Sequence, residues 1–123
     1  HGDMIVECAA SIVNNTRDTF IIMTPNNGIV SNLPDDLMIE VPALLGVNGV
    51  EPFAVGKIGT FYKGLIESQY AYEKLTVEAY LEGSYEKALQ ALTLNRLVVD
   101  AKRARKVLDS LIEANSEYWP ELK

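Results

Sequence analysis

The stretch that decides the fold covers residues 19–44, TFIIMTPNNGIVSNLPDDLMIEVPAL. Its first part, residues 19–24, is a short run rich in apolar and β-branched residues, which is typical of a strand. The PNNG tetrapeptide at 25–28 predicts a turn, because asparagine and glycine tolerate a positive φ. Residues 37–44 predict another strand, and Pro42 within it indicates an edge position in the sheet. Two short strands joined by a turn-rich loop therefore form the centre of the sequence.

A helix and a third strand flank this centre. Asp3 is a suitable N-cap for a helix over residues 4–13, which Asn14-Asn15 would end. Its apolar residues fall in doublets with the spacing of one buried helix face. The doublets are Met4-Ile5, Cys8-Ala9 and Ile12-Val13. On the other side of the centre, Asn48-Gly49 predicts a tight turn and Phe53–Val55 a third short strand.

Three helices are predicted in the second half of the chain. The first begins near Ile58 and ends at Gly83. Ser84 caps the second and Asp100 caps the third. The expected architecture is thus α+β, with an N-terminal helix, short antiparallel strands and then three helices, all within a single domain over residues 1–123.

Composition and charge narrow the class of protein. The net charge of -6 argues against a nucleic-acid-binding module, which needs a basic surface to neutralise phosphates. Cys8 is the only cysteine, so no internal disulfide can form and a reducing cytoplasm is the expected compartment. No apolar run approaches membrane-spanning length, and no signal peptide opens the chain.

The residues that usually carry catalysis are scarce. The one histidine, His1, and the one cysteine cannot form a zinc or iron site or a Ser-His-Asp triad within this chain. No glycine-rich phosphate-binding loop is present. Cys8 is expected to be a small buried apolar residue, and the basic run 102–106 to form a solvated helix face. Asp35-Asp36, in a turn that begins with proline, is expected to cap the start of a strand or helix. These residues describe a scaffold.

A family resemblance adds to this description. The stretch Thr24–Pro42, TPNNGIVSNLPDDLMIEVP, closely resembles a signature of the C-terminal domain of glycoside hydrolase family 4. In that family N-x-G-x-I-x-N-L-P is followed by acidic residues and then by E-V-P. Similar elements follow in the family's order at Pro52–Gly56, Tyr72–Ala79, Ala88–Leu92, Leu108–Asn115 and Tyr118–Leu122.

Within the family, Tyr72–Val77 and Asn115–Leu122 look most like the 6-phospho-α-glucosidases, also called maltose-6'-phosphate glucosidases. The 6-phospho-β-glucosidase and α-galactosidase branches share the N-x-G and N-L-P elements and stay open as alternatives. The resemblance implies the fold of the C-terminal domain that lactate dehydrogenase and family 4 glycosidases share. His1-Gly2-Asp3 is similar to the family's opening of the first helix, so His1 is either native or a tag remnant.

The resemblance implies an NAD- and manganese-dependent parent enzyme. Family members cleave the O-glycosidic bond of phosphorylated disaccharides such as maltose 6'-phosphate by oxidation, elimination, addition of water and reduction. The metal-binding, acid and base residues of the family lie upstream of this region. The resemblance therefore implies no catalytic, cofactor-binding or metal-binding residue in this chain, which would be an inactive scaffold. An upstream Rossmann domain and a second copy of the protein are its implied partners.

One loop remains a candidate for contact with a ligand or partner. The amides of Asn26, Asn27 and Asn32, with Gly28, could lie at the edge of the active site or in a subunit interface. The alternative is structural, with Asn27-Gly28 supplying a positive-φ turn and Asn32 capping the next segment. For the whole chain, an autonomous protein-interaction module and a relative of lactate or malate dehydrogenase are the competing interpretations.

Overall fold

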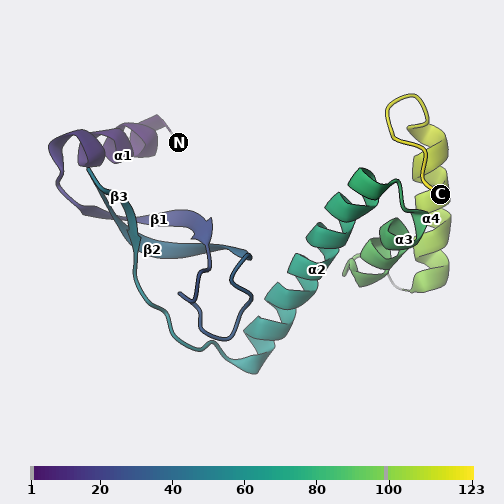
Figure 1. Cartoon of the computed structure of the whole chain (residues 1–123), viewed down its shortest axis with the longest axis horizontal. Coiled ribbons are helices and arrows are strands. Elements are labelled where there is room, and N and C mark those ends of the chain that lie inside the picture. Colours follow the sequence, from purple (N-terminus) through teal and green to yellow (C-terminus); the bar gives the residue numbers. More distant parts are fainter. Residues whose placement is uncertain (1, 99) are drawn as a thin grey trace. The chain divides into compact units, whose positions relative to one another are not determined.

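The computed structural model describes residues 2–98 and 100–123 (Figure 1). The chain forms two compact units, one up to Lys63 and one from Gly64 onward. His1, with the question of its origin, lies outside the described residues. The order of elements is a helix, three strands and three helices, so the predicted α+β class is confirmed.

The first unit is built on an antiparallel sheet in the order β1-β2-β3. Its strands are β1 (Asp18–Pro25), β2 (Met38–Gly46) and β3 (Gly49–Pro52). The first two match the strands predicted around the turn-rich loop. The third lies earlier than the predicted 53–55, because β2 and β3 are joined by a tight turn at Val47-Asn48 and pair from Gly46↔Gly49 onward.

Pro42 lies in the middle strand, so the expected edge position was wrong. In β2 it stands opposite Ile21 of β1. Its carbonyl accepts a hydrogen bond from the Phe53 N–H at 3.0 Å, one residue beyond the end of β3. Since the nitrogen and carbonyl of a residue in an antiparallel strand point to the same side, the missing N–H of Pro42 faces the side where β3 has just ended. The ladder with β1 loses no bond.

One face of the sheet forms the core of this unit. Alternate residues of β2 are buried, as period-2 patterning requires. They are Ile39, Val41, Ala43 and Leu45, and Val30, Leu33 and Leu37 from the loop complete the buried set. The other face carries exposed apolar side chains, among them Ile21 and Met23 of β1, an edge strand.

Helix α1 (Gly2–Asn14) lies beside the sheet (Figure 1) and packs on β2 through an unexpected residue. Ser11 is 1% exposed, and its hydroxyl donates to the Leu45 carbonyl at 2.6 Å. The Asp18 N–H donates to the same hydroxyl at 3.1 Å. The apolar doublets predicted as the buried face are instead largely exposed, with Val13 82% accessible. The prediction was wrong because periodicity identifies an apolar face but not the element that covers it.

The end of α1 is held against the β2–β3 turn at Gly46. The Asn15 side-chain oxygen accepts a hydrogen bond from the Val47 N–H at 3.1 Å. A Cβ on Gly46 would lie 2.8 Å from that oxygen and 3.1 Å from Cγ of Arg17. Only glycine therefore lets the α1–β1 connection approach the turn this closely.

Replacing Gly46 with alanine is expected to lower the free energy of unfolding by about 1–3 kcal/mol, because Asn15 must move and release Val47. Gly64→Ala is a matched control, since nothing lies within 4 Å of a Cβ at that helical position. It should stabilise the protein by about 0.5–1 kcal/mol. Urea denaturation followed by circular dichroism measures both, and equal midpoints for the two variants would contradict the close approach.

The second unit contains most of α2 (Thr60–Glu82), followed by α3 (Tyr85–Leu94) and α4 (Ala101–Ala114). The caps predicted at Ser84 and Asp100 are present, whereas Asp3, predicted as the cap of the first helix, lies inside the first turn of α1. Ser84 accepts from the Lys87 N–H at 3.3 Å, and Asp100 accepts from the Arg103 N–H at 2.8 Å. Gly83 ends α2 with a φ of +64°, as expected of a C-terminal glycine. Among the residues described in this unit, Ala79, Ala91, Ala104 and Leu108 are the buried apolar ones.

Side chains on the surface also join the helices of the second unit. Lys87 of α3 forms ion pairs at 2.7 Å with Glu78 and with Glu82 of α2, and these bonds raise the pKa of the lysine. The Tyr85 hydroxyl donates to the Asp109 carboxylate of α4 at 2.7 Å, which raises the pKa of the phenol. Glu82 and Asp109 are exposed and the other three groups are half-buried. Ion pairs and hydrogen bonds at such surface positions fix geometry more than they add stability.

Candidate functional site

The loop between β1 and β2 is organised by Asn26, which is fully buried. Its side-chain nitrogen donates to the carbonyls of Val30 and Leu33 at 3.0 Å and of Pro34 at 3.1 Å. Its side-chain oxygen accepts from the Val30 N–H at 2.7 Å. A single amide thus bonds to four backbone groups. The Val30 and Pro34 carbonyls also accept from the N–H groups of Leu33 and Leu37, whereas the Val30 N–H and the Leu33 carbonyl depend on Asn26. The side chain of Asn26 is committed to the loop itself and is not available to a ligand.

Asn27 and Gly28 form the exposed tip of this loop. Their φ angles of +42° and +84° confirm the positive-φ turn predicted from the sequence. The Ile29 N–H donates to the Asn26 carbonyl at 2.8 Å and closes the turn. Both residues are exposed, so the tip is the part of the loop whose surface can meet another molecule.

Asn32 joins the loop to the segment that leads into α2. Its amide nitrogen donates to the Ile58 carbonyl at 3.0 Å, and its oxygen accepts from the Ile58 N–H at 3.1 Å. A parallel bridge between Val30 and Gly56 lies next to this pair. The sequence predicted that Asn32 would cap the residues directly after it, whereas the structure shows a bond to a backbone 26 residues away.

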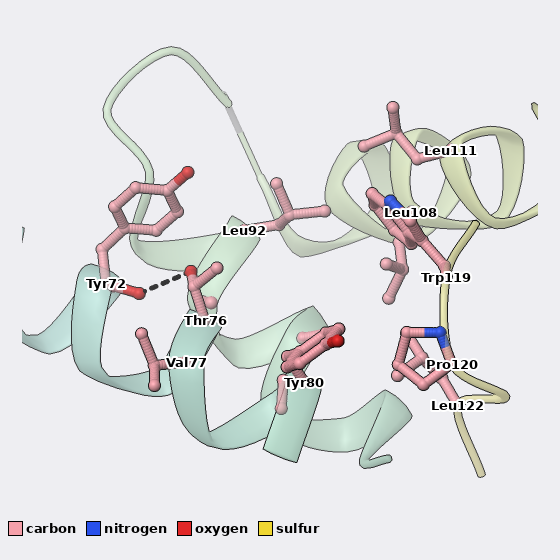
Figure 2. Close-up of a pocket in the computed structure, with 13 residues that line it drawn as sticks. Tyr72, Thr76, Val77, Tyr80, Leu92, Leu108, Leu111, Trp119, Pro120 and Leu122 are labelled. Carbon is pink, nitrogen blue, oxygen red and sulfur yellow. Dashed lines mark hydrogen bonds between the residues drawn. The ribbon is translucent and has the colours of Figure 1, made fainter. Parts of the chain in front are cut away.

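A second candidate surface is an apolar groove of about 570 Å³ within the second unit (Figure 2). One side is formed by α2, with Val77 and Tyr80, which are 58% and 63% exposed. The other sides are formed by Leu92 of α3, Leu108 and Leu111 of α4, and Trp119, Pro120 and Leu122 of the C-terminal tail. The sequence did not predict that the helices and the tail would form a groove.

The chemistry of the groove is limited. None of the described residues that line it is charged. The Thr76 hydroxyl donates to the Tyr72 carbonyl at 2.8 Å, so its proton is already engaged (Figure 2). Acid–base catalysis requires a titratable group within hydrogen-bond reach of a substrate. The lining of the groove is therefore suited to packing against apolar groups, and the hydroxyls of Tyr72 and Tyr80 are its titratable groups.

Metal ligands do not gather in the described part of the chain. Over residues 2–98 and 100–123, no group of three or more His, Cys, Asp or Glu side chains could hold an ion. Cys8 is partly buried rather than fully buried as expected. Asp35 and Asp36 are exposed in their turn, and the basic residues of 102–106 are exposed on α4.

Among the described residues, no helix combines the length and the apolar character needed to cross a bilayer.

Comparison with known proteins identifies the family. The model of the family 4 glycosyl hydrolase C-terminal domain matches residues 1–98. Phospho-alpha-glucosidase PagL of Clostridium acetobutylicum is 57% identical over 99% of this chain and 27% of its own length. The maltose-6'-phosphate glucosidase of Fusobacterium mortiferum is 48% identical over the whole chain and 28% of its own.

A solved structure agrees with these relatives. The crystal structure of a 6-phospho-alpha-glucosidase from gut microorganisms in complex with NAD and Mn²⁺ has a TM-score of 0.91 and 49% identity, and the match covers all of this chain and 28% of that one. The chain is a C-terminal domain of the glycosidase type, and it belongs to glycoside hydrolase family 4. Within the family it is more similar to the α-glucosidases than to 6-phospho-beta-glucosidase BglT of Thermotoga maritima, at 36% identity.

The matches cover only part of each relative. The chain spans a little over a quarter of the length of the relatives that it matches, 27% for PagL and 28% for the Fusobacterium enzyme. The family resemblance predicted from the 24–42 signature is confirmed. The role of Asn26, Asn27, Gly28 and Asn32 at an active-site edge or interface stays a prediction.

Proposed function

We propose that this chain is the C-terminal part of a 6-phospho-α-glucosidase that uses NAD and a divalent metal, manganese in the first instance. The complete protein would hydrolyse the O-glycosidic bond of phosphorylated disaccharides such as maltose 6'-phosphate. The observation that carries the proposal is the 57% identity to PagL along nearly the whole chain, against 36% to the β-glucosidase BglT.

The proposal gives this chain the role of a scaffold. Its described residues form no metal site, and its groove is apolar, so we place the binding of NAD and metal in the part of the polypeptide that precedes it. That part, a Rossmann domain, and a second copy of the protein are the proposed partners of residues 1–123. The single cysteine supports a reducing compartment, the cytoplasm.

The loop tip is a region where this chain could approach the substrate. Asn27 and Gly28 are exposed and held in a fixed conformation by the buried Asn26. A rigid, exposed turn is suited to forming one wall of a site assembled on another domain. We propose this contact as part of the scaffold role, together with the alternative that the tip lies in the subunit interface.

An assay of the complete protein tests the proposal. With NAD and Mn²⁺, the α-anomer of a nitrophenyl 6-phosphoglucoside should be cleaved at least about a hundredfold faster than the β-anomer. EDTA should abolish cleavage, and residues 1–123 alone should release no nitrophenol. Preference for the β-anomer would move the protein to the other branch of the family. Cleavage by residues 1–123 alone would overturn the scaffold role, and complete inactivity of the whole protein would favour an interaction module.

A further inference from the structure

Helix α1 is apolar over far more of its surface than the sheet covers. At about 100° per residue, its apolar residues occupy about two thirds of the helix circumference. A helix on the surface of a globular protein usually has an apolar stripe roughly half that wide. The remaining third carries Asp3, Glu7, Ser11 and Asn14. A helix with this distribution is normally surrounded by other elements on most of its sides.

The contact between α1 and β2 does not account for this wide apolar surface, because it involves the polar third of the helix. Ser11, which faces β2, is the buried residue of α1 among those described, and it belongs to the polar third. On the far side, Ile5 is 65%, Val6 67% and Val13 82% exposed. Together with Ala9, these three form a second apolar stripe, called here the outer stripe of α1.

We propose that the outer stripe of α1 packs against the part of the same polypeptide that precedes this chain in the complete enzyme. The inference rests on the proposed function, because it requires that the chain is the C-terminal part of a longer enzyme. The comparisons support it. The matching family model is that of a C-terminal domain, and the relatives are between three and four times as long as the segment they share with this chain.

The charges on α1 disfavour a membrane surface as the occupant. Helices that lie on membranes carry lysine and arginine on their polar face, which anionic lipids attract. Between Gly2 and Asn14 the charged residues are Asp3 and Glu7, both acidic. A second copy of the chain is the other molecule that could cover the outer stripe. In that case the melting temperature of the protein would depend on its concentration.

The test compares two neighbouring substitutions in the complete enzyme, Val13→Asp on the outer stripe and Asn14→Asp on the polar third. Both place one carboxylate in the last turn, so the unfavourable interaction with the helix dipole is matched. If Val13 is buried by the preceding part, Val13→Asp should melt about 10 °C below Asn14→Asp, because it buries an unpaired charge. Melting temperatures within about 2 °C of each other would overturn the proposal.

A milder variant covers the case in which Val13→Asp does not fold. At an exposed helix position, Val13→Ala should raise the melting temperature by about 1 °C, because alanine has the higher helix propensity. At a buried position it should lower it by about 5 °C, through loss of packing. The sign of the shift therefore decides whether the stripe is covered, and a rise would overturn the proposal.

Light scattering on the same samples identifies the occupant. The expected result is an unchanged molar mass for wild type and Val13→Asp, with a melting shift that does not depend on concentration. A mass that falls to that of one subunit in Val13→Asp would assign the stripe to a second copy and overturn the proposal. Hydrolysis of the 6-phospho-α-glucoside by the wild-type enzyme is measured separately, so the proposed function stands or fails independently.

Discussion

Replacing Asn26 with alanine is expected to lower the free energy of unfolding of the first unit by about 3–5 kcal/mol. The substitution removes four hydrogen bonds and leaves two groups, the Val30 N–H and the Leu33 carbonyl, without the partner that Asn26 provides at a fully buried position. Each buried polar group left without a partner costs about 1–3 kcal/mol, and partial relaxation of the loop reduces the sum. Urea denaturation followed by circular dichroism gives the value.

The adjacent residue supplies the control. Asn27→Gly changes an exposed side chain at a φ of +42°, which glycine adopts without strain, so its effect should stay within about 0.5 kcal/mol. If the two variants unfold at the same urea concentration, Asn26 does not organise the loop. In the complete enzyme, Asn26→Ala should also disturb the tip at Asn27-Gly28, because the turn depends on the Asn26 position.

Gly83→Ala is expected to destabilise the second unit by about 2–4 kcal/mol. Gly83 ends α2 with a φ of +64°, which costs an alanine about 1–2 kcal/mol. Its Cβ would also lie 3.0 Å from the Glu121 carbonyl oxygen of the tail. The tail is held here by the Lys123 N–H, which donates to the Gly83 carbonyl at 2.7 Å, and by the Tyr85 N–H, which donates to the Lys123 carbonyl at 3.0 Å.

Gly28→Ala separates the backbone strain at Gly83 from the close contact between its new Cβ and the Glu121 carbonyl. Gly28 has a φ of +84° but nothing within 4 Å of a Cβ, so its substitution carries the backbone strain alone, about 1–2 kcal/mol. Trp119, the one tryptophan of the chain, lies in the tail and lines the groove. Its fluorescence should shift to longer wavelength in Gly83→Ala and stay unchanged in Gly28→Ala. An unshifted spectrum in Gly83→Ala would mean that the tail does not depend on the close approach.

Much of the fold could be predicted because its signals are local. The caps at Ser84 and Asp100 and the turn at Asn27-Gly28 are set by residues within a few positions of each other. The position of β3 and the role of Pro42 could not be predicted in the same way, since they depend on which strand lies next to which. A proline in the central strand is harmless here only because β3 ends at Pro52.

In the candidate site, too, features set by local sequence could be predicted and features set by the tertiary arrangement could not. The sequence singled out Asn26 and Asn32 as amides on a turn, but their hydrogen-bond partners follow from the folded loop and, for Asn32, from Ile58 far along the chain. The burial of Ser11 had a signal, a hydroxyl placed between two apolar doublets of the first helix. The groove lined by Trp119 had none, because α2, α3, α4 and the tail must be assembled before it exists.

The edge position of β1 has a practical consequence for handling the protein. In the described part of the chain β1 pairs only with β2, which leaves its other edge open. Residues 19–24 of this edge contain no charge and no proline, and Ile21 and Met23 are each 62% exposed. Natural sheets protect such edges with charges, prolines or a covering element, since bare edges recruit strands from other molecules. Produced without a covering element, residues 1–123 should form intermolecular β-aggregates at high protein concentration and stay soluble when dilute. A complete enzyme that stays soluble at the same high concentration would indicate that its other part shields β1.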